Sequence, residues 1–587
     1  MTVHSYPFYT QLAGILNSDQ ARSIIVSGNV YDLFFTGQQY EPLLQFLSEK
    51  SQTRGLFRIV YELNGPVRIL DDRDRLKSAW ISWKAGVDFD TLVIKGMQAR
   101  GRSEVERLGE EFDRLLLDAI GNPTLALELL RQLTICSRSS KLPSHLLILI
   151  EAADMLLPAG NGDVAALNDK QLHRIAIMQD WLGDPAFMNA GDSVVLIAES
   201  RSLIHPRISK LPQVLSVEIP APTTADRRRY IDHFFATAQH LPQLWSTPDD
   251  LASFTAGLSI HAIRQLLVAA AYSREVLAPA NIVDKVENFI QGQLGEDIVE
   301  FKKPTHTLQD VVGNSKLKRF LQNELLPRFR APPDKALSGA AVAGAIGGGK
   351  TFVFEALASE LDVPVLVLKN IRSQWYGQTD VIFERLRRVL EALEKVVIFV
   401  DEADTQFGGV GEETHATERR LTGKIQAMMS DPRLKGKVFW LLMTARIHLL
   451  SPDIRRPGRV GDLIIPVLDP EGDDRREFLR WVARAVLADP SDSDLDRLDQ
   501  LTGGYSAAAF TSLRSQLKAS DAKTIDEVVA IVNDQLPPAI DLTRRYQTLH
   551  ALVNCTRRSL LPKPDVTDEE RQAWQLEIRR LEQLGIR

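Results

Sequence analysis

The chain has 587 residues, which is too long for one hydrophobic core and indicates about four compact units at roughly 150 residues each. Hydrophobic residues make up 44% and charged residues 25% of the chain, so its composition excludes a disordered or fibrous protein. A formal net charge of −6 disfavours a surface made to grip nucleic acid, although it leaves room for a local basic channel.

The sequence shows no sign of membrane insertion or secretion. No stretch approaches the roughly 18 to 20 consecutive apolar residues that a membrane-spanning helix needs. Residues 1–10 contain neither a basic segment nor a long apolar run, so a secretory signal is not predicted. Cys136 and Cys555 lack the spacing of a zinc site or a disulfide framework. We therefore expect a cytoplasmic protein with two buried thiols.

The two halves of the chain repeat each other. In the first half, the apolar strand at 146–150 ends in Glu151. Roughly 250 residues later, the apolar strand at 396–400 ends in Asp401 and Glu402. Two further pairs of segments match in the same order at nearly the same offset, residues 222–230 with 470–478 and residues 254–259 with 501–506. Chance does not readily give three ordered matches, so the sequence predicts a tandem duplication.

Each copy alternates apolar strands with amphipathic helices and then becomes rich in helix, a pattern typical of a parallel sheet with a helical appendage. The predicted fold class is therefore α/β. A capping box at Thr567–Glu570 begins a last helix, which we expect to pack rather than to bind a partner. The predicted boundaries are 1–220 for the first α/β domain, 221–300 for its helical lid, 301–470 for the second α/β domain, 471–540 for its lid and 541–587 for a C-terminal helical extension.

The second copy carries a phosphate-binding loop. Residues 344–351, GAIGGGKT, fit the pattern GxxxxGK[ST], between an apolar strand at 340–343 and a helix-forming segment at 354–361. Glycines let the backbone N–H groups and the helix N-terminus face the phosphates, the lysine adds charge at the β- and γ-oxygens, and the threonine can ligate magnesium. The predicted contacts are Gly344, Gly347, Gly348, Gly349, Lys350 and Thr351.

The acidic pair lies at the matching sheet edge, because ligands of parallel sheets bind at the carboxyl ends of the strands. Asp401 is predicted to hold the magnesium with its water shell, and Glu402 to orient or deprotonate the attacking water. General-base assistance of this kind contributes about 10²- to 10⁴-fold in rate.

Several further segments, in order, resemble those of the AAA subgroup of the AAA+ ATPases. Asp310–Gly313 is similar to the opening that flanks the adenine, Arg419-Arg420 to a basic pair after the acidic strand, and residues 504–506 to the start of the lid helix that carries the second sensor. The resemblance covers residues 305–520 closely and the first half faintly. It implies an AAA+ P-loop fold, ATPase activity, ATP and Mg²⁺ as cofactors, and nucleotide contacts from Val312, Gly313, Phe352 and Gly504.

Residues 456–459, RPGR, match the arginine-finger segment of that family. The resemblance implies that Arg456 and Arg459 reach the nucleotide of a neighbouring subunit. A finger supplied in trans contributes about 10³- to 10⁵-fold to the rate, so assembly would switch catalysis on. Because such an interface joins unlike patches, a closed homo-oligomeric ring follows, with six subunits as the family norm. Surface salt bridging is the alternative role for these arginines.

Residues 373–377, SQWYG, resemble the aromatic pore loop of the family. The resemblance implies that Trp375 and Tyr376 face a central channel and grip an extended polypeptide. Large aromatic side chains suit such a nonspecific grip, because they offer contact area with little rotamer entropy to lose. Burial in the core is the alternative for this pair. Residues 408–414 could form a second channel loop or an ordinary surface loop.

Both copies depart from the family pattern at positions that affect the predicted chemistry. The first copy has no GK[ST] before its acidic strand, and Glu151-Ala152 replaces the Asp-Glu pair, so we expect it to be inert. It would support the ring or recruit substrate, with weak nucleotide binding as a lesser alternative. In the second copy, Ala445 falls at the polar first-sensor position. Thr444 would substitute for it if the strand is shifted, and otherwise hydrolysis is expected to be slow. Ala507 also replaces a usual glycine.

The sequence therefore predicts a ring-forming ATPase that remodels a protein client or receives one from an adaptor. A nucleotide-dependent scaffold that does not thread substrates is the second hypothesis, favoured by the inert first copy and by Ala445. A DNA-associated motor is a third, which the acidic composition disfavours.

Overall fold

The computed structural model describes residues 5–52, 56–97, 102–142, 144–160, 167–274, 276–294, 299–302, 306–332, 334–361, 363–369, 379–393, 395–407, 416–536 and 539–586. The chain divides into two compact units. Unit 1 contains Met1–Phe289 and Tyr376–Ala392, and unit 2 contains Ile290–Trp375 and Leu393–Arg587. Within the described ranges, no helix combines the length and apolar character that crossing a bilayer requires.

Unit 1 is built on a mixed sheet with the strand order β5-β4-β6-β7-β1-β8. Its strands are β1 (Ser23–Gly28), β4 (Phe57–Tyr61), β5 (Val67–Ile69), β6 (Leu146–Ile150), β7 (Ser193–Ala198) and β8 (Val214–Ile219). Neighbouring strands are parallel, except that β5 pairs antiparallel with β4. The central strands are buried along their whole length, as expected for a parallel sheet covered on both faces.

Helices cover the two faces of this sheet, and side chains alternate between two separate cores. Ile25 contributes to one hydrophobic cluster, and Ile24 and Val26 to the other. The covering helices and the small β2–β3 hairpin are α1 (Pro7–Asn17), β2 (Leu33–Phe35), β3 (Tyr40–Pro42), α2 (Leu43–Ser51), α3 (Arg73–Ala85), α4 (Phe89–Met97), α5 (Glu104–Asp118), α6 (Pro123–Cys136), α7 (Ala153–Leu156), α8 (Asp169–Gly183), α9 (Pro185–Met188) and α10 (Pro206–Ser209).

After the sheet, the chain of unit 1 becomes helical. The segments are α11 (Thr224–Thr237), β9 (Gln243–Leu244), α12 (Pro248–Phe254), α13 (Ile260–Ser273), β10 (Val276–Leu277) and α14 (Pro279–Leu294). The helix α18 (Thr379–Ala392), which comes much later in the sequence, also belongs to this unit. Its Arg385 donates to both carboxylate oxygens of Glu199, at 2.6 and 2.9 Å, and its Arg387 pairs with Glu218 at 2.7 Å.

Unit 2 repeats the same sheet. The strand order is β11-β13-β14-β15-β12-β16, with β11 antiparallel and the other pairs parallel. The strands are β11 (Val299–Phe301), β12 (Gly339–Ala343), β13 (Val365–Leu368), β14 (Val396–Val400), β15 (Val438–Thr444) and β16 (Ile464–Pro466). The order β13-β14-β15-β12-β16 matches β4-β6-β7-β1-β8 of unit 1, which confirms the predicted tandem α/β organisation.

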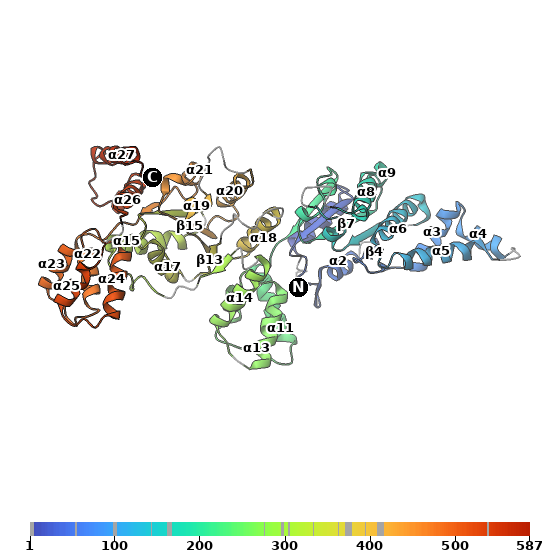
Figure 1. Ribbon diagram of the computed structural model, residues 1–587. Coiled ribbons are helices and arrows are strands. Elements are labelled where there is room, and N and C mark those ends of the chain that lie inside the picture. The colour runs from blue at the N-terminus through green and yellow to red at the C-terminus, as the bar shows by residue number, and fades with distance from the viewer. Residues whose placement is uncertain are drawn as a thin grey trace. The chain divides into compact units, whose positions relative to one another are not determined.

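The helices of unit 2 fall into three groups along the chain (Figure 1). Around the sheet lie α15 (Ser315–Phe320), α16 (Leu326–Arg330), α17 (Lys350–Leu361), α19 (Ala403–Phe407), α20 (Ala416–Met429) and α21 (Pro452–Arg455). The predicted lid is formed by α22 (Gly472–Ala483), α23 (Asp492–Leu501), α24 (Ala507–Ala519) and α25 (Ile525–Asn533), which enclose a core of their own. The C-terminal pair is α26 (Asp541–Asn554) and α27 (Asp568–Gln583), and α27 begins at the predicted capping box of Thr567.

Candidate functional site

The glycine loop joins β12 to α17, as the sequence predicts. A Cβ atom on Gly344 would lie 2.2 Å from the carbonyl oxygen of Val467, so no side chain fits there. Gly347 and Gly349 have φ angles of 73° and 82°, in the left-handed region that glycine adopts at little cost. Three glycines of the motif are therefore required by the path of the backbone.

Lys350, Thr351 and Asp401 converge at the end of this loop. The Nζ atom of Lys350 donates to the carbonyl oxygens of Gly344 at 2.9 Å and Ala345 at 3.0 Å. Burial lowers the pKa of Lys350, and the nearby Asp401 carboxylate opposes that shift. The Thr351 hydroxyl donates to Asp401 Oδ2 at 3.2 Å, which brings together two oxygen ligands of the kind that magnesium prefers.

Glu402 has an unusual backbone conformation. Its φ angle is 48°, and its side chain is exposed beside Asp401, whose Oδ1 accepts from the Glu402 N–H at 2.8 Å. A non-glycine residue in this region costs of order 1–3 kcal/mol, and such strain is concentrated at functional sites. In unit 1, Ala152 occupies the corresponding place after β6 with a φ angle of 51°. The first copy keeps the turn but has lost the carboxylate.

Asp404 is a residue of this region that sequence reasoning missed. It is 7% exposed and accepts from the Thr444 hydroxyl at 2.6 Å and from Arg446 Nε at 2.7 Å. Thr444, which is 1% exposed, also accepts from the Arg446 N–H at 2.8 Å. The hydroxyl of Thr444 thus ties the end of β15 to the helix after the acidic pair. Its catalytic role stays a prediction.

The two arginines of the finger segment have different surroundings. Arg459 is 8% exposed, and it donates to Ser430 Oγ and to the Asp453 carbonyl oxygen, both at 2.9 Å. Burial lowers the pKa of Arg459, and the charge of Arg456 adds to the effect. Arg456 is exposed, and within the part of the chain that the structure describes no hydrogen bond or ion pair holds its guanidinium. Of the two, only Arg456 is presented outward.

The predicted adenine-side residues lie where α17 and the lid meet the rest of the domain. A Cβ atom on Gly313 would be 2.9 Å from the ring of Phe478 in α22, and Val312 packs against the lid core. Phe352 is 46% exposed and stacks on His306 with ring centroids 3.8 Å apart.

The lid also touches the phosphate loop directly. The N–H of Ala508, in the first turn of α24, donates to the carbonyl oxygen of Gly347 at 3.0 Å. A Cβ atom on Gly349 would lie 3.4 Å from the Cβ of Ala507, so alanine at that position packs against the loop. Gly504 precedes this helix, exposed and with a φ angle of 76°.

Some predicted features lie outside the described residues. These are Trp375 and Tyr376 of the predicted pore loop, and the loop at 408–414. Arg419 and Arg420 lie on α20, whose side chains are described only from residue 422 onward.

In unit 1, a buried carboxylate stands where unit 2 has its phosphate loop. Asp32 follows β1, the counterpart of β12, and is 2% exposed. Its oxygens accept from the backbone N–H groups of Leu33, Ile260 and His261 at 2.8 to 3.0 Å, and from the Asn29 side chain at 2.8 Å. Burial raises the pKa of Asp32.

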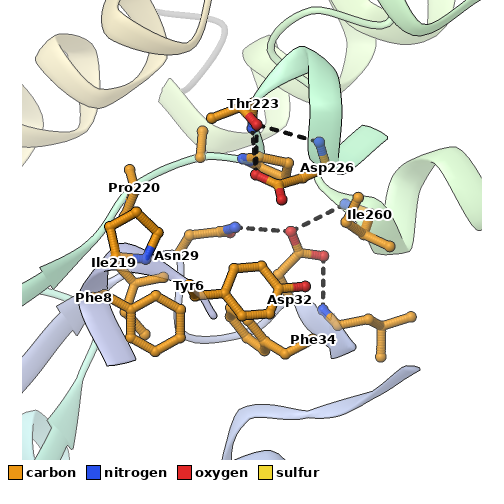
Figure 2. A pocket seen from close by; sticks show the side chains of 14 residues that line it. Tyr6, Phe8, Asn29, Asp32, Phe34, Ile219, Pro220, Thr223, Asp226 and Ile260 are labelled. Carbon is orange, nitrogen blue, oxygen red and sulfur yellow. Dashed lines mark hydrogen bonds between the residues drawn. The ribbon is translucent and has the colours of Figure 1, made fainter. Parts of the chain in front are cut away.

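The cavity beside Asp32 is small and mainly apolar (Figure 2). Tyr6, Phe8 and Phe34 line it, together with the end of β8 and the start of α11. Its volume is about 60 Å³, whereas pockets for drug-sized ligands run to about 300–1,000 Å³. A buried carboxylate thus occupies the place where the second copy has its phosphate loop, and the inertness of the first copy stays a prediction.

Comparison with known families bears on both units. Residues 4–220 match the family described as AAA+ chaperone, N-terminal Rossmann-like domain. Residues 340–466 match the family described as ATPase family associated with various cellular activities. The chain carries an AAA+ chaperone N-terminal domain and an AAA ATPase domain. The AAA+ match of the second unit contains the glycine loop, the acidic pair, Thr444 and the finger segment.

Curated relatives are similar over part of the chain. A Cell division cycle protein 48 homolog from Archaeoglobus fulgidus is 28% identical over 253 residues, covering 40% of this chain and 33% of the relative. Protein SAV from Sulfolobus acidocaldarius is 29% identical over 198 residues, covering 33% of this chain and 24% of the relative. The match thus spans about a third or less of each relative.

Proposed function

We propose that the chain binds and hydrolyses Mg²⁺-ATP in its second unit and uses the energy to remodel protein clients. The observation that carries this proposal is the convergence of Lys350, Thr351 and Asp401 at the end of the glycine loop. Lys350 would bind the β- and γ-phosphate oxygens, while Thr351 and Asp401 would hold magnesium. When bound, magnesium neutralises charge on the phosphates.

Glu402 is placed to act on the attacking water. Its side chain is exposed next to Asp401, and its strained backbone sets the direction in which it leaves the strand. Its conformation is fixed by the helix that follows, because the N–H groups of Thr405 and Gln406 both donate to the Glu402 carbonyl oxygen. These contacts favour Glu402 as the residue that orients the water or accepts its proton.

The exposed Arg456 supports assembly into a homo-oligomeric ring, for which six subunits are the family norm. A guanidinium presented outward beside the buried Arg459 can stabilise transition-state charge on the nucleotide of an adjoining subunit. Unit 1 would then serve as a support or a client-recruiting platform, because it carries the buried carboxylate of Asp32 where unit 2 has its phosphate loop.

The test uses Glu402→Gln, with wild-type protein as the reference. The variant should bind ATP with similar affinity, lose hydrolysis by about 10²- to 10⁴-fold, and retain assembled rings with captured client on affinity purification. Wild-type rates of hydrolysis in the variant would show that another group activates the water.

The scaffold hypothesis is separated from remodelling by Trp375→Ala with Tyr376→Ala. A translocase should lose client remodelling while its ATPase rate is kept. A scaffold should be indifferent to both changes. Duplex DNA binding that weakens steeply with salt would instead support the DNA-associated motor.

A further inference from the structure

The C-terminal helix α26 touches the phosphate loop, although it lies outside residues 340–466 that match the ATPase family. Arg544 and Gln547 make the contact. They are three residues apart and so share one face of the helix. Both are buried, at 9% and 5% exposure, which is unusual for side chains of these types unless they are fully hydrogen-bonded.

These two side chains bond both backbone groups of Ile346, in the middle of the loop. The Ile346 N–H donates to Gln547 Oε1 at 2.9 Å, and Arg544 Nη1 donates to the Ile346 carbonyl oxygen. The following Gly347 has a φ angle of 73° and no side chain to restrict it. Lys350 and the lid hold the carbonyl groups on either side of Ile346, and α26 adds the restraint on Ile346 itself.

Arg544 is anchored on its other side. Its Nη2 donates to Asp469 Oδ1 and Oδ2 at 2.6 and 2.5 Å, shortly after β16. Charge-assisted bonds of this kind are about twice as strong as neutral ones. The guanidinium thus bridges the end of the sheet and the glycine loop. Its positive charge contributes to lowering the pKa of Lys350, after burial, so Arg544 acts within electrostatic reach of the phosphate site.

The helix that carries these residues is itself held firmly. His550 stacks on His448, which lies just after β15, with ring centroids 4.1 Å apart. The Tyr546 hydroxyl donates to Glu582 of α27 at 3.0 Å, and Tyr546 packs in a core with Ile578. A face fixed in this way holds Ile346 in one position, which is what preorganised ligand binding requires.

We propose that Arg544 and Gln547 are positioning residues of the nucleotide site, which hold the phosphate loop in the conformation that receives ATP. The inference rests on the proposed ATPase function of the same site. Without these two side chains, the backbone at Ile346 would have to be ordered by the nucleotide itself. The substitutions should therefore weaken ATP binding and leave the rate of the chemical step nearly unchanged.

The experiment measures ATP binding by a fluorescent ATP analogue, KM and kcat by steady-state hydrolysis, and the melting temperature without nucleotide. Gln547→Met keeps the side-chain volume but removes the acceptor for the Ile346 N–H. Arg544→Ala removes the bridge, and Arg544→Lys tests for partial rescue by a single ammonium group without the guanidinium fork. Arg545→Ala is the matched control, because Arg545 is the adjacent arginine but pairs with Glu577 on α27, at 2.7 Å.

Arg544→Ala should raise Kd and KM by roughly 10- to 100-fold and Gln547→Met by roughly three- to tenfold, with kcat within about threefold. Arg544→Lys should recover part of the loss, and Arg545→Ala should bind ATP like the wild type. If Arg544→Ala does not fold, the Kd and KM of Gln547→Met test the inference. Unchanged affinity in folded variants, or a lower melting temperature without a rise in KM, would overturn the inference. If wild-type protein binds no ATP, the proposed function fails instead.

Discussion

Replacing Thr444 by valine should destabilise unit 2 because it breaks a buried network. The change removes the hydroxyl that donates to Asp404 at 2.6 Å and accepts from the Arg446 N–H at 2.8 Å. A bond to an ionised carboxylate contributes about 1.5–3 kcal/mol and a neutral one about 0.5–1.5 kcal/mol, so a loss of about 2–4 kcal/mol is expected. The Arg446 side chain is 44% exposed, so its ion pair with Asp404 offsets little of this loss of stability.

The assay is thermal unfolding without nucleotide, followed by calorimetry or dye fluorescence. The transition of unit 2 should fall by about 5–10 °C in Thr444→Val, and Thr444→Ser should restore most of it. The control is Thr511→Val, which removes a hydroxyl from an exposed helix position and should change stability by about 0.5 kcal/mol or less. A Thr444→Val protein with unchanged melting temperature and a much lower kcat would refute the structural role and support a catalytic one.

Three further predictions concern the finger arginines, His550 and Asp32. Arg456→Ala should lower kcat by about 10³-fold or more while ATP binding is kept, whereas Arg459→Ala should lower the melting temperature, because it removes a buried side chain together with its hydrogen bonds to Ser430 and to the Asp453 carbonyl oxygen; equal losses of kcat with intact folding would contradict this. Burial lowers the pKa of His550 to about 4, so the stability that neutral His550 contributes is full above about pH 6.5 and is lost as the pH falls towards 4. The fall in melting temperature between about pH 7 and pH 5 should therefore be smaller in His550→Phe than in the wild type, and an equal fall would exclude His550 as the titrating group. Asp32→Ala should expose α11–α14 to protease, because it leaves the N–H groups at the start of α13 without their acceptor; an unchanged digestion pattern would show that Asp32 does not hold these helices.

The fold was predictable because its signals are local. The apolar strands at 146–150 and 396–400, each followed by an acidic residue, indicated the tandem repeat. The two sheets of the structure share one order for five of their strands, as that repeat predicts. The glycine loop was equally clear, since Gly344 and Gly347 occupy backbone positions that other residues tolerate poorly. Local backbone geometry of this kind is determined by neighbouring residues in the sequence.

Contacts between distant segments were not predictable. Ile346 and Arg544 are 198 residues apart in sequence, and nothing in the composition of α26 distinguishes Arg544 from Arg545. The burial of Arg459 beside the exposed Arg456 likewise depends on Ser430, which lies on a different element. Asp32 could have been suspected only from its position shortly after a strand that aligns with β12. In each case tertiary packing assigns the role, and the residue type alone does not.

The most direct test of the account is the stoichiometry of nucleotide binding, measured by titration calorimetry of Mg²⁺-ATP into the Glu402→Gln protein and into a double variant that also carries Lys350→Ala. One nucleotide per chain should bind in the first protein, with affinity abolished in the second, since unit 1 lacks a GK[ST] motif and has the buried Asp32 in place of the phosphate loop. Two nucleotides per chain, or binding that survives Lys350→Ala, would contradict the assignment of a single active site to the second unit.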